Sequence, residues 1–429
     1  MKKAKGILII VLMALIVTGI TNFFNPTPRG EVVMKEDDGK PTITILAGQS
    51  TSDAGTEEMM QKVLEEKFPE VNFQWICVGW ASDNYKMRLM GKYDISNPPD
   101  IIIGKAQDAV SYAETQLLLP VPEESVRNVL AEDVETVTHD GQIYALPYTC
   151  QYQGVLYNKE LFAENGFAIP RNTEDLQNLV IQMEEKGITP FASHYQEAWN
   201  VGNNSMQFFM NEIFQYNPDW GNELRSGNSS FRNNPQAKKC FYDSRYILEH
   251  SWEDALQLEQ YDCDERFARG EAAMYLTGCW SLQTIGQTSQ LIEIGIFPYP
   301  NEAGDAKLIK EYNISFMKGK NTKNPELVDE ILMELGNNLE LAKNVADYTR
   351  GESTFTSLQD YVITEIQSDI AVYEKNNQVI DVNIGNKQLI WSYQSDVAEE
   401  ELLWLQGKQG LDEVLMYADM TIENSLAVK

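Results

Sequence analysis

Histidine is scarce in this chain, and basic residues are far outnumbered by acidic ones. Only three histidines occur among 429 residues. His139, His194 and His250 are far apart in sequence, which disfavours a zinc site or a histidine-based catalytic triad. The 34 Lys and Arg residues face 64 Asp and Glu residues, giving a net charge of −30. Because phosphate binding needs a basic surface, nucleic acid is excluded as a partner.

Cysteine is also sparse. The five cysteines form no Cys-x-x-Cys pair and no compact spacing, so a disulfide scaffold is not indicated. We interpret them as small buried apolar residues. The chain is 43% hydrophobic, 10% aromatic and 23% charged, which excludes wholesale disorder and a polytopic membrane protein. Its length predicts two or three domains, and we expect no cofactor and no metal.

The N-terminus has the layout of an export signal. Lys2, Lys3 and Lys5 precede an apolar run over Ile7–Ile20. Residues 1–24 are therefore predicted to be a signal peptide, cleaved near Gly19, or an uncleaved anchor that holds the protein at the outer membrane face. A buried core helix is the alternative for this run. Residues 25–40 read as a flexible linker.

From residue 41 the chain predicts an α/β fold. Alternation at Thr42–Leu46 and Val71–Val78 favours strands, and Asp100–Ile103 reads as a buried parallel strand. Helices are expected at Thr56–Phe68 and Asp83–Met90. This β-α-β-α-β order implies a doubly wound open sheet, whose ligands lie beyond the carboxyl ends of the strands. The polar residues that follow the first and third strands are the candidates: Gln49, Ser52, Asp53, Gln107 and Asp108.

A second α/β region begins near Gly154. Extended segments at Tyr144–Tyr148 and Val155–Tyr157 are expected to be interrupted between them, where the chain leaves one lobe for another. The strand Ile294–Pro300 is predicted to make the return crossing. Asn200–Asn234 is rich in Asn, Gly and Ser and suggests long loops. Helices are predicted at Glu174–Glu185, Ser205–Gln215, Gln236–Glu249, Ala255–Tyr261 and Phe267–Tyr275.

Several segments together resemble the extracellular solute-binding proteins of carbohydrate ABC importers, the group that includes the maltose-binding proteins. They keep one order along the chain and cover nearly all of it beyond residue 41. The segments are PDIIIG (Pro99–Gly104), LLLPV (Leu117–Val121), DGQIYALPY (Asp140–Tyr148), LYNKELFAENG (Leu156–Gly166), FARGEAAMYLTGCWS (Phe267–Ser281), IGIFPYP (Ile294–Pro300), KNPE (Lys323–Glu326) and QGKQGLDEVL (Gln406–Leu415).

The resemblance implies a two-lobed, periplasmic-binding-protein-like α/β fold with a hinge, each lobe a doubly wound sheet flanked by helices. Two such lobes can close over a ligand by hinge motion. The first lobe is predicted to comprise 41–148 and 297–350, and the second 149–296, with C-terminal helices over 351–429.

Flat aromatic rings are the first site candidates, because sugars present apolar C–H faces. The resemblance places Trp280 at a position where an aromatic stacks on sugar, and Trp391 resembles a third platform of the family. Trp199 follows the strand-like Thr189–Ala192. Gln151 and Tyr152, at the first crossing, are candidates for ligand hydroxyl groups.

Acidic residues are given a structural interpretation. Asp262, Asp264 and Glu265 are expected to precede a helix and to complement its dipole instead of binding metal.

The resemblance implies a monomeric, non-enzymatic receptor outside the membrane that binds a carbohydrate and delivers it to an ABC transporter permease. A secreted glycoside hydrolase and a ligand-sensing subunit of a membrane receptor stay open as alternatives.

Overall fold

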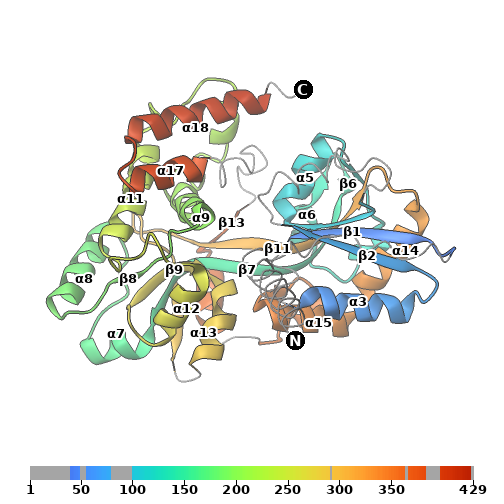
Figure 1. The fold of residues 1–429 in the computed structure, drawn as a ribbon, viewed down its shortest axis with the longest axis horizontal. Coiled ribbons are helices and arrows are strands. Elements are labelled where there is room, and N and C mark those ends of the chain that lie inside the picture. The colour runs from blue at the N-terminus through green and yellow to red at the C-terminus, as the bar shows by residue number, and fades with distance from the viewer. Residues whose placement is uncertain are drawn as a thin grey trace, which may run out of the picture.

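The computed structural model describes residues 39–48, 55–78, 99–289, 292–362, 366–382 and 397–426. Figure 1 shows two lobes joined by long strands, which confirms the predicted two-lobed α/β fold. The leader and the helix predicted at Asp83–Met90 lie outside the described residues. No described helix is long and apolar enough to cross a membrane.

The elements up to the first crossing strand build most of the first lobe. They are β1 (Thr42–Gly48), α3 (Thr56–Lys67), β2 (Asn72–Val78), β3 (Ile101–Gly104), α5 (Ala106–Glu114), β4 (Leu118–Leu119), η1 (Glu123–Val126), α6 (Ala131–Glu135), β5 (Thr138–His139), β6 (Gln142–Ile143) and β7 (Ala145–Asn158).

The next elements build the second lobe. They are α7 (Lys159–Asn165), α8 (Thr173–Glu185), β8 (Phe191–Ala192), α9 (Ala198–Phe209), the π-helix η2 (Met210–Phe214), α10 (Trp220–Arg225), α11 (Pro235–Glu249), α12 (Gln260–Ala268), β9 (Met274–Gly278), η3 (Cys279–Ser281), α13 (Leu282–Thr288) and β10 (Ile294–Phe297).

After β10 the chain returns to the first lobe and ends on the second (Figure 1). These elements are β11 (Leu308–Gly319), α14 (Pro325–Asn337), α15 (Leu339–Thr349), β12 (Glu352–Ser353), η4 (Thr356–Leu358), α16 (Gln367–Lys375), β13 (Val379–Asp381), α17 (Ala398–Leu405) and α18 (Leu411–Leu426). The lobe boundaries predicted from the sequence stay predictions.

One connected sheet runs through the described part of both lobes, in the order β2-β1-β3-β11-β7-β9-β8. In the first lobe β1 pairs in parallel with β2 and β3, as the β-α-β rhythm predicted. The strand Ile101–Gly104 is fully buried, which explains why it reads as a continuous apolar run. The sheets of the two lobes are thus continuous through β7 and β11.

The first crossing is a single strand, so the interruption predicted at residues 149–154 is wrong. β7 is 14 residues long and buried throughout. Its edges pair with β11, β12, β9 and β10. Gly154 lies within the strand at a position that needs glycine, because a Cβ there would come within 2.7 Å of the Leu308 side chain and the Phe297 carbonyl. The polar and glycine residues that suggested a break are therefore positions of close contact.

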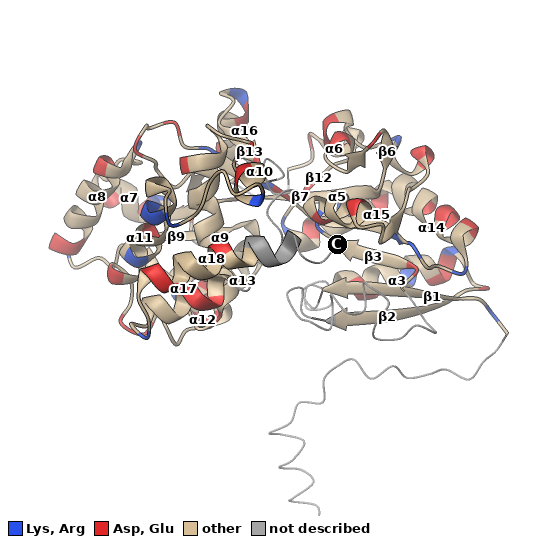
Figure 2. Cartoon of the chain, turned by 90° about the horizontal axis from the view of Figure 1, so that it is seen from above, with Lys and Arg blue, Asp and Glu red and all other residues tan. Residues whose placement is uncertain are grey.

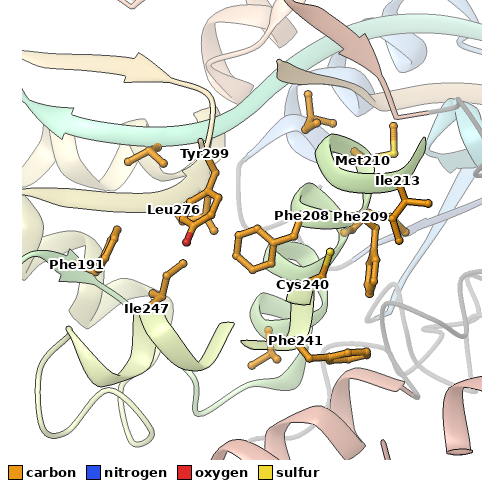
Figure 3. Close-up of a cluster of buried hydrophobic side chains, with 14 of the residues drawn as sticks. Phe191, Phe208, Phe209, Met210, Ile213, Cys240, Phe241, Ile247, Leu276 and Tyr299 are labelled. Atoms are coloured by element: carbon orange, nitrogen blue, oxygen red, sulfur yellow. The ribbon is translucent and has the colours of Figure 1, made fainter. Parts of the chain in front are cut away.

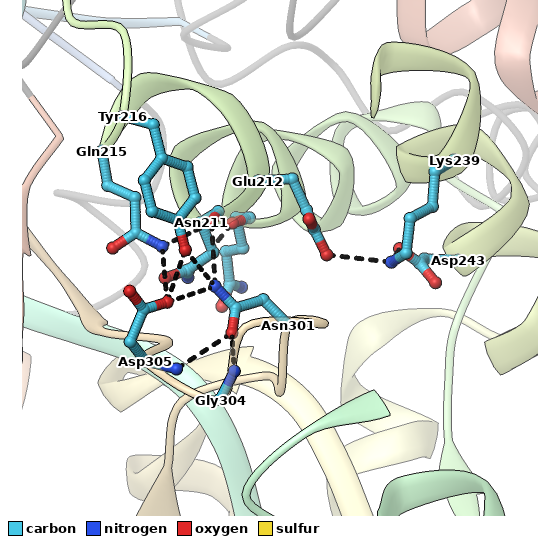
Figure 4. Close-up of polar contacts among 10 residues, drawn as sticks. Asn211, Glu212, Gln215, Tyr216, Lys239, Asp243, Asn301, Gly304 and Asp305 are labelled. Carbon is cyan, nitrogen blue, oxygen red and sulfur yellow. Dashed lines mark hydrogen bonds and ion pairs between the residues drawn. The ribbon is translucent and has the colours of Figure 1, made fainter. Parts of the chain in front are cut away.

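The return crossing is β11, not the predicted strand Ile294–Pro300. β10 pairs only with Val155–Asn158 of β7, whereas β11 pairs with β7 and also with β3 in the first lobe. The connection into β11 is fixed to η2, as Figure 4 shows. Asn211 Nδ2 donates to the Lys307 carbonyl at 3.0 Å, and Asn301 Nδ2 donates to Asp305 Oδ1 at 2.8 Å.

Helices in the second lobe also differ from the prediction. The helix predicted at Ser205–Gln215 is confirmed, but α9 already begins at Ala198 and continues into η2. The rest of Asn200–Asn234, expected to be long loops, also contains α10, and α12 begins at Gln260 instead of Ala255. The helix predicted at Phe267–Tyr275 is the end of α12 followed by β9. Gly270, at φ +75°, lies between them and ends the helix because this left-handed conformation favours glycine.

The two lobes have different cores. The first lobe packs aliphatic side chains of its sheet against α14 and α15, including Ile101, Leu332 and Val345. Figure 3 shows the second lobe, where Phe208 and Phe209 of α9 lie among other aromatic and apolar side chains. Acidic residues are spread over the outer helices of both lobes (Figure 2), consistent with the large negative charge.

Candidate functional site

A buried carboxylate lies where the two lobes join. Glu311 of β11 accepts hydrogen bonds from Gln107 Nε2 at 2.9 Å and Gln153 Nε2 at 2.8 Å, and it pairs with Lys105. Lys105 is the N-cap position of α5 in the first lobe, and Gln153 belongs to β7. This Glu311 cluster therefore links a first-lobe helix to both crossing strands.

Gln107 and Asp108 were predicted in a loop, but both lie in the first turn of α5 and are buried. Gln107 Oε1 and Asp108 Oδ1 have no hydrogen-bond partner. Burial raises the pKa of Asp108 to about 8, against the opposing effect of Lys105. Its carboxyl is therefore mostly protonated at neutral pH. The structure brings these two residues to the junction of the lobes with an unused oxygen on each.

Gln151 and Tyr152 lie in the crossing strand β7, and their polar ends are engaged by the protein. Gln151 Nε2 donates to the Thr349 carbonyl at the end of α15. The Tyr152 hydroxyl donates to Glu374 of α16 and lies 3.4 Å from Glu352 Oε2 of β12. Both residues thus hold neighbouring elements against the crossing strand.

Trp280 lies in the short helix η3, at the end of β9. Gly278 of β9 pairs with Gln153 of the crossing strand. Trp280 follows Gly278 by two positions in the sequence and is therefore close to the junction. A Cβ on Gly278 would come within 2.2 Å of the ring, which shows that the indole covers the end of the strand. The side chain is partly exposed, yet its Nε1 is buried without a partner.

Trp199 is the second residue of α9, which follows the short strand β8, and it is also partly exposed. Its Nε1 donates to Glu197 Oε2 at 3.0 Å, and its ring lies 5.3 Å from that of His194. The His194 ring in turn lies 6.1 Å from the ring of Tyr275 in β9. His194 is fully buried, and burial lowers its pKa to about 3, so the imidazole is neutral.

These contacts place both tryptophans on one polar region of the second lobe. The Tyr275 hydroxyl lies beside the Asp264 carboxyl of α12, and Asp264 adjoins Ser281, the residue after Trp280. Figure 1 shows α9 on the side of this lobe nearest the crossing strands. We call this set the second-lobe patch: His194, Trp199, Asn200, Asn203, Asp264, Tyr275 and Trp280.

Most of the patch is not evident from the sequence. Asn200 and Asn203 read as loop residues, yet both are buried on α9, and each has a polar atom without a partner. Their spacing of three along a helix was the available signal. The expectation that Asp264 precedes a helix and complements its dipole is wrong, because it lies inside α12 and is 1% exposed.

Gln49, Ser52, Asp53 and Trp391 lie outside the described residues, so their predicted roles stay predictions.

Among the described residues, no group of His, Cys, Asp and Glu is arranged to hold a metal ion. The five cysteines are free, and four of them are buried, which agrees with their interpretation as apolar residues. A polar hollow at the start of α11 is lined by Asn228, Ser229 and Asn234 among others.

Comparison with known proteins identifies relatives across most of the chain. The family model of the bacterial extracellular solute-binding protein matches residues 47–337. The multiple sugar-binding protein of Streptococcus mutans is 21% identical over 298 residues, which cover 67% of this chain and 68% of that protein. The maltotriose-binding protein of Pyrococcus abyssi is 22% identical over 262 residues, covering 56% and 54% of the two chains.

Solved structures show the same fold. RafE in complex with raffinose superposes with a TM-score of 0.72 at 17% identity, covering 89% of this chain and 99% of that one. A chitin oligosaccharide binding protein gives a TM-score of 0.75 at 17% identity, covering 90% and 99%. With the family model spanning more than half of the sequence, the chain belongs to the family of bacterial extracellular solute-binding proteins.

Proposed function

We propose that this extracytoplasmic protein captures a sugar or oligosaccharide between its lobes and delivers it to the permease of an ABC transporter. The observation that carries the proposal is the second-lobe patch. Two partly exposed indoles, Trp199 and Trp280, flank buried polar groups next to the strands that join the lobes. Aromatic faces with a few convergent polar groups are the composition that sugar recognition needs.

The names of the relatives support a carbohydrate ligand. The proteins compared above bind multiple sugars, maltotriose, raffinose and chitin oligosaccharides. A melibiose, raffinose and stachyose-binding protein of Bacillus subtilis is 21% identical over 289 residues. These ligands differ in length and linkage, so they define a class and not a single sugar.

The charges near the junction favour an uncharged ligand. Lys105 is paired with Glu311, and Lys310 lies 3.0 Å from Asp133. An anionic sugar would have to compete with these carboxylates for Lys105 and Lys310, in a protein that already carries −30. We therefore expect neutral oligosaccharides to bind more tightly than uronic acids or sugar phosphates of the same size.

A thermal-shift screen tests the proposal. The panel contains maltotriose, raffinose, stachyose and chitin oligosaccharides, with glucuronic acid and glucose 6-phosphate as anionic controls. A sugar present at 100 times its dissociation constant stabilises the native state by about 2.7 kcal/mol. The sugar should be recovered chemically unchanged after long incubation. Hydrolysis by the pure protein would instead support a glycoside hydrolase, and no shift with any neutral sugar would contradict the proposed ligand class.

We further propose that the protein works as a monomer outside the membrane, held there by residues 7–24 or released after cleavage near Gly19. The basic and apolar leader supports this location. Fractionation of cells and sedimentation of the purified protein test both statements. Recovery of most of the full-length protein in the cytosol would contradict the location, and a stable dimer would contradict the oligomeric state.

A further inference from the structure

Asp264 lies at the centre of contacts that hold the turn carrying Trp280. Gln260 Nε2, on the same helix α12, lies 3.4 Å from Asp264 Oδ2 and 3.5 Å from Ser281 Oγ, within reach of both. Ser281 Oγ shares a hydrogen bond of 3.0 Å with Thr277 Oγ1 of β9. The Asp264 carboxyl and the residue next to Trp280 thus share one amide donor.

The hydrogen bonding around this carboxyl is incomplete. Asp264 Oδ1, the Tyr275 hydroxyl and Trp280 Nε1 are all buried without a partner. Buried polar groups are normally paired, so three unpaired atoms around one turn require an explanation. The Tyr275 hydroxyl is close enough to favour the ionised carboxylate, yet it does not reach hydrogen-bond geometry. A small movement of the turn can therefore make or break contacts with Asp264.

Asp264 is the group of this region that changes charge near neutral pH. Burial raises its pKa to about 7, although the side chains of Tyr275, Ser281, Gln260 and Thr284 oppose the shift. All four of these side chains can donate a hydrogen bond, so the ionised carboxylate can use every one of them. When the carboxyl is protonated, one of its oxygens becomes an O–H donor. It can then accept fewer hydrogen bonds and needs an acceptor for its own hydrogen.

The titratable neighbours keep their charge over the same range. Burial lowers the pKa of His194 to about 3 and raises the pKa values of Tyr275 on β9 and Cys263 on α12 well above their usual ranges. Cys279 in η3 has a pKa raised to about 12, also by burial. Arg266 of α12 is paired with Asp254 and Glu271. The described part of α13 offers Gln and Thr side chains but no ionisable ones.

We propose that Asp264 is a positioning residue for the ligand site, and that loss of its proton draws in the Trp280 turn and fixes the indole ring for stacking on ligand. The ionised carboxylate draws in the Ser281 and Tyr275 hydroxyls, which fixes the backbone on either side of the ring. Affinity for sugar should therefore rise with pH through neutrality. The pH dependence of sugar affinity rests on the proposed function, whereas the movement of the ring does not.

The ring is followed without any ligand by ¹⁹F NMR of protein labelled with 5-fluorotryptophan. The resonance of Trp280, one of eight tryptophans, is the one that disappears in the Trp280→Phe variant. In the wild type it should shift between pH 5 and 9 with a midpoint near 7. In Asp264→Asn the shift should be absent. A pH-independent resonance in the wild type, or an unchanged titration in Asp264→Asn, overturns the proposal.

The matched control is Glu401→Gln. Glu401 is another buried second-lobe carboxyl, hydrogen-bonded to Ser205, and burial raises its pKa to about 8. This variant should keep the titration of the Trp280 resonance, and its loss there would overturn the assignment to Asp264. If Asp264→Asn does not fold, Asp264→Ser removes the same titration, and the wild-type experiment still decides whether the ring responds to pH.

A second experiment measures the binding of a sugar at different pH values. The sugar is raffinose, or whichever neutral sugar of the panel stabilises the wild type. Its dissociation constant should fall at least threefold from pH 5.5 to pH 8.5 in the wild type and stay constant in Asp264→Asn. An equal pH dependence in both proteins overturns the role of Asp264. The two failures are distinguishable, because failure of the proposed function means that no sugar binds at either pH while the ring still titrates.

Discussion

The two lobes of this protein share a sheet but bury different chemistry. The first-lobe core is mainly aliphatic, with Ile43, Ile101 and Leu332 as typical members. The second-lobe core is rich in aromatic rings, such as Phe209, Trp220 and Phe231, whose centroids lie 5.1 to 6.0 Å apart. Aromatic packing with defined geometry stabilises a lobe that also has to accommodate polar groups.

Buried polar atoms without partners gather in the second lobe among the described residues. Besides the atoms of the second-lobe patch, Asn204 Oδ1 and Gln207 Nε2 are buried in this lobe without a hydrogen-bond partner. The described first lobe has fewer of them: Thr44 Oγ1, Gln107 Oε1, Asp108 Oδ1, Asp133 Oδ2, Ser315 Oγ and Arg350 Nε. This difference supports the proposal that the second lobe supplies most of the groups that contact the ligand.

The largest expected effect tests the difference between the cores. Trp220 is buried and contacts Phe209, Phe214 and Phe231. Trp220→Ala should destabilise the protein by about 3 to 5 kcal/mol, and the first-lobe truncation Leu332→Ala by about 2 to 4 kcal/mol. Chemical denaturation measures both. A larger loss for Leu332→Ala would contradict the view that aromatic packing dominates the stability of the second lobe.

The junction between the lobes should be the next most sensitive region. Glu311→Gln leaves Lys105 without its buried partner and weakens the hydrogen bonds from Gln107 and Gln153. We expect a loss of about 3 kcal/mol in the free energy of unfolding. The control is Asp347→Asn, whose partly exposed pair with Lys343 on α15 should contribute less than about 1 kcal/mol, and whose amide oxygen can still accept the hydrogen bond from Tyr361. Equal effects would show that the Glu311 cluster does not link the lobes.

Each lobe contains a buried acid that should make stability fall as pH rises. Burial raises the pKa values of Asp108 in the first lobe and Glu401 in the second to about 8. These groups favour the folded state at low pH, and the contribution is lost as pH rises through about 8, because the unfolded chain has already released the proton. At 1.36 kcal/mol per pH unit, the loss per group is on the order of 3 kcal/mol between pH 5 and pH 7, and it levels off above pH 8.

Denaturation of the wild type at pH 5, 7 and 9 measures this slope. Asp108→Asn and Glu401→Gln should each reduce it by a similar amount, which would make the two lobes alike in this respect. A slope that one variant leaves unchanged would show that the corresponding carboxyl is already ionised in the folded protein, and it would sharpen the contrast between the lobes.

The sequence predicted local apolar patterns well and long-range polar contacts poorly. The strand at Ile101–Gly104 and the helix α3 follow from burial and periodicity over a few residues. β7 was predicted to be interrupted because the chain was expected to leave one lobe for the other there, at positions that include Gln151 and Gln153. They are buried because of partners far along the chain, Thr349 and Glu311. No local pattern reveals such pairs.

The candidate site shows the same limit. Trp280, a candidate from the resemblance alone, lies in a short helix that follows a strand paired with the crossing strand. The segment before it was predicted as a helix because Glu271, Ala272 and Ala273 favour one. Pairing of Met274–Gly278 with β7 and β8 overrides that propensity. Asp264 was assigned to a helix terminus because sequence spacing does not reveal its contact with Ser281.

The central claim is that partly exposed indoles of the second lobe recognise the ligand, and one titration tests it most directly. Trp280→Ala should weaken binding of the panel sugar by roughly 1 to 3 kcal/mol, about tenfold to more than hundredfold. The matched first-lobe variant is Trp75→Ala, which removes an indole that donates to Gln61 at 2.6 Å. Calorimetric titration should show unchanged affinity for Trp75→Ala. Unchanged affinity in a folded Trp280→Ala protein, or an equal loss in Trp75→Ala, would contradict the account.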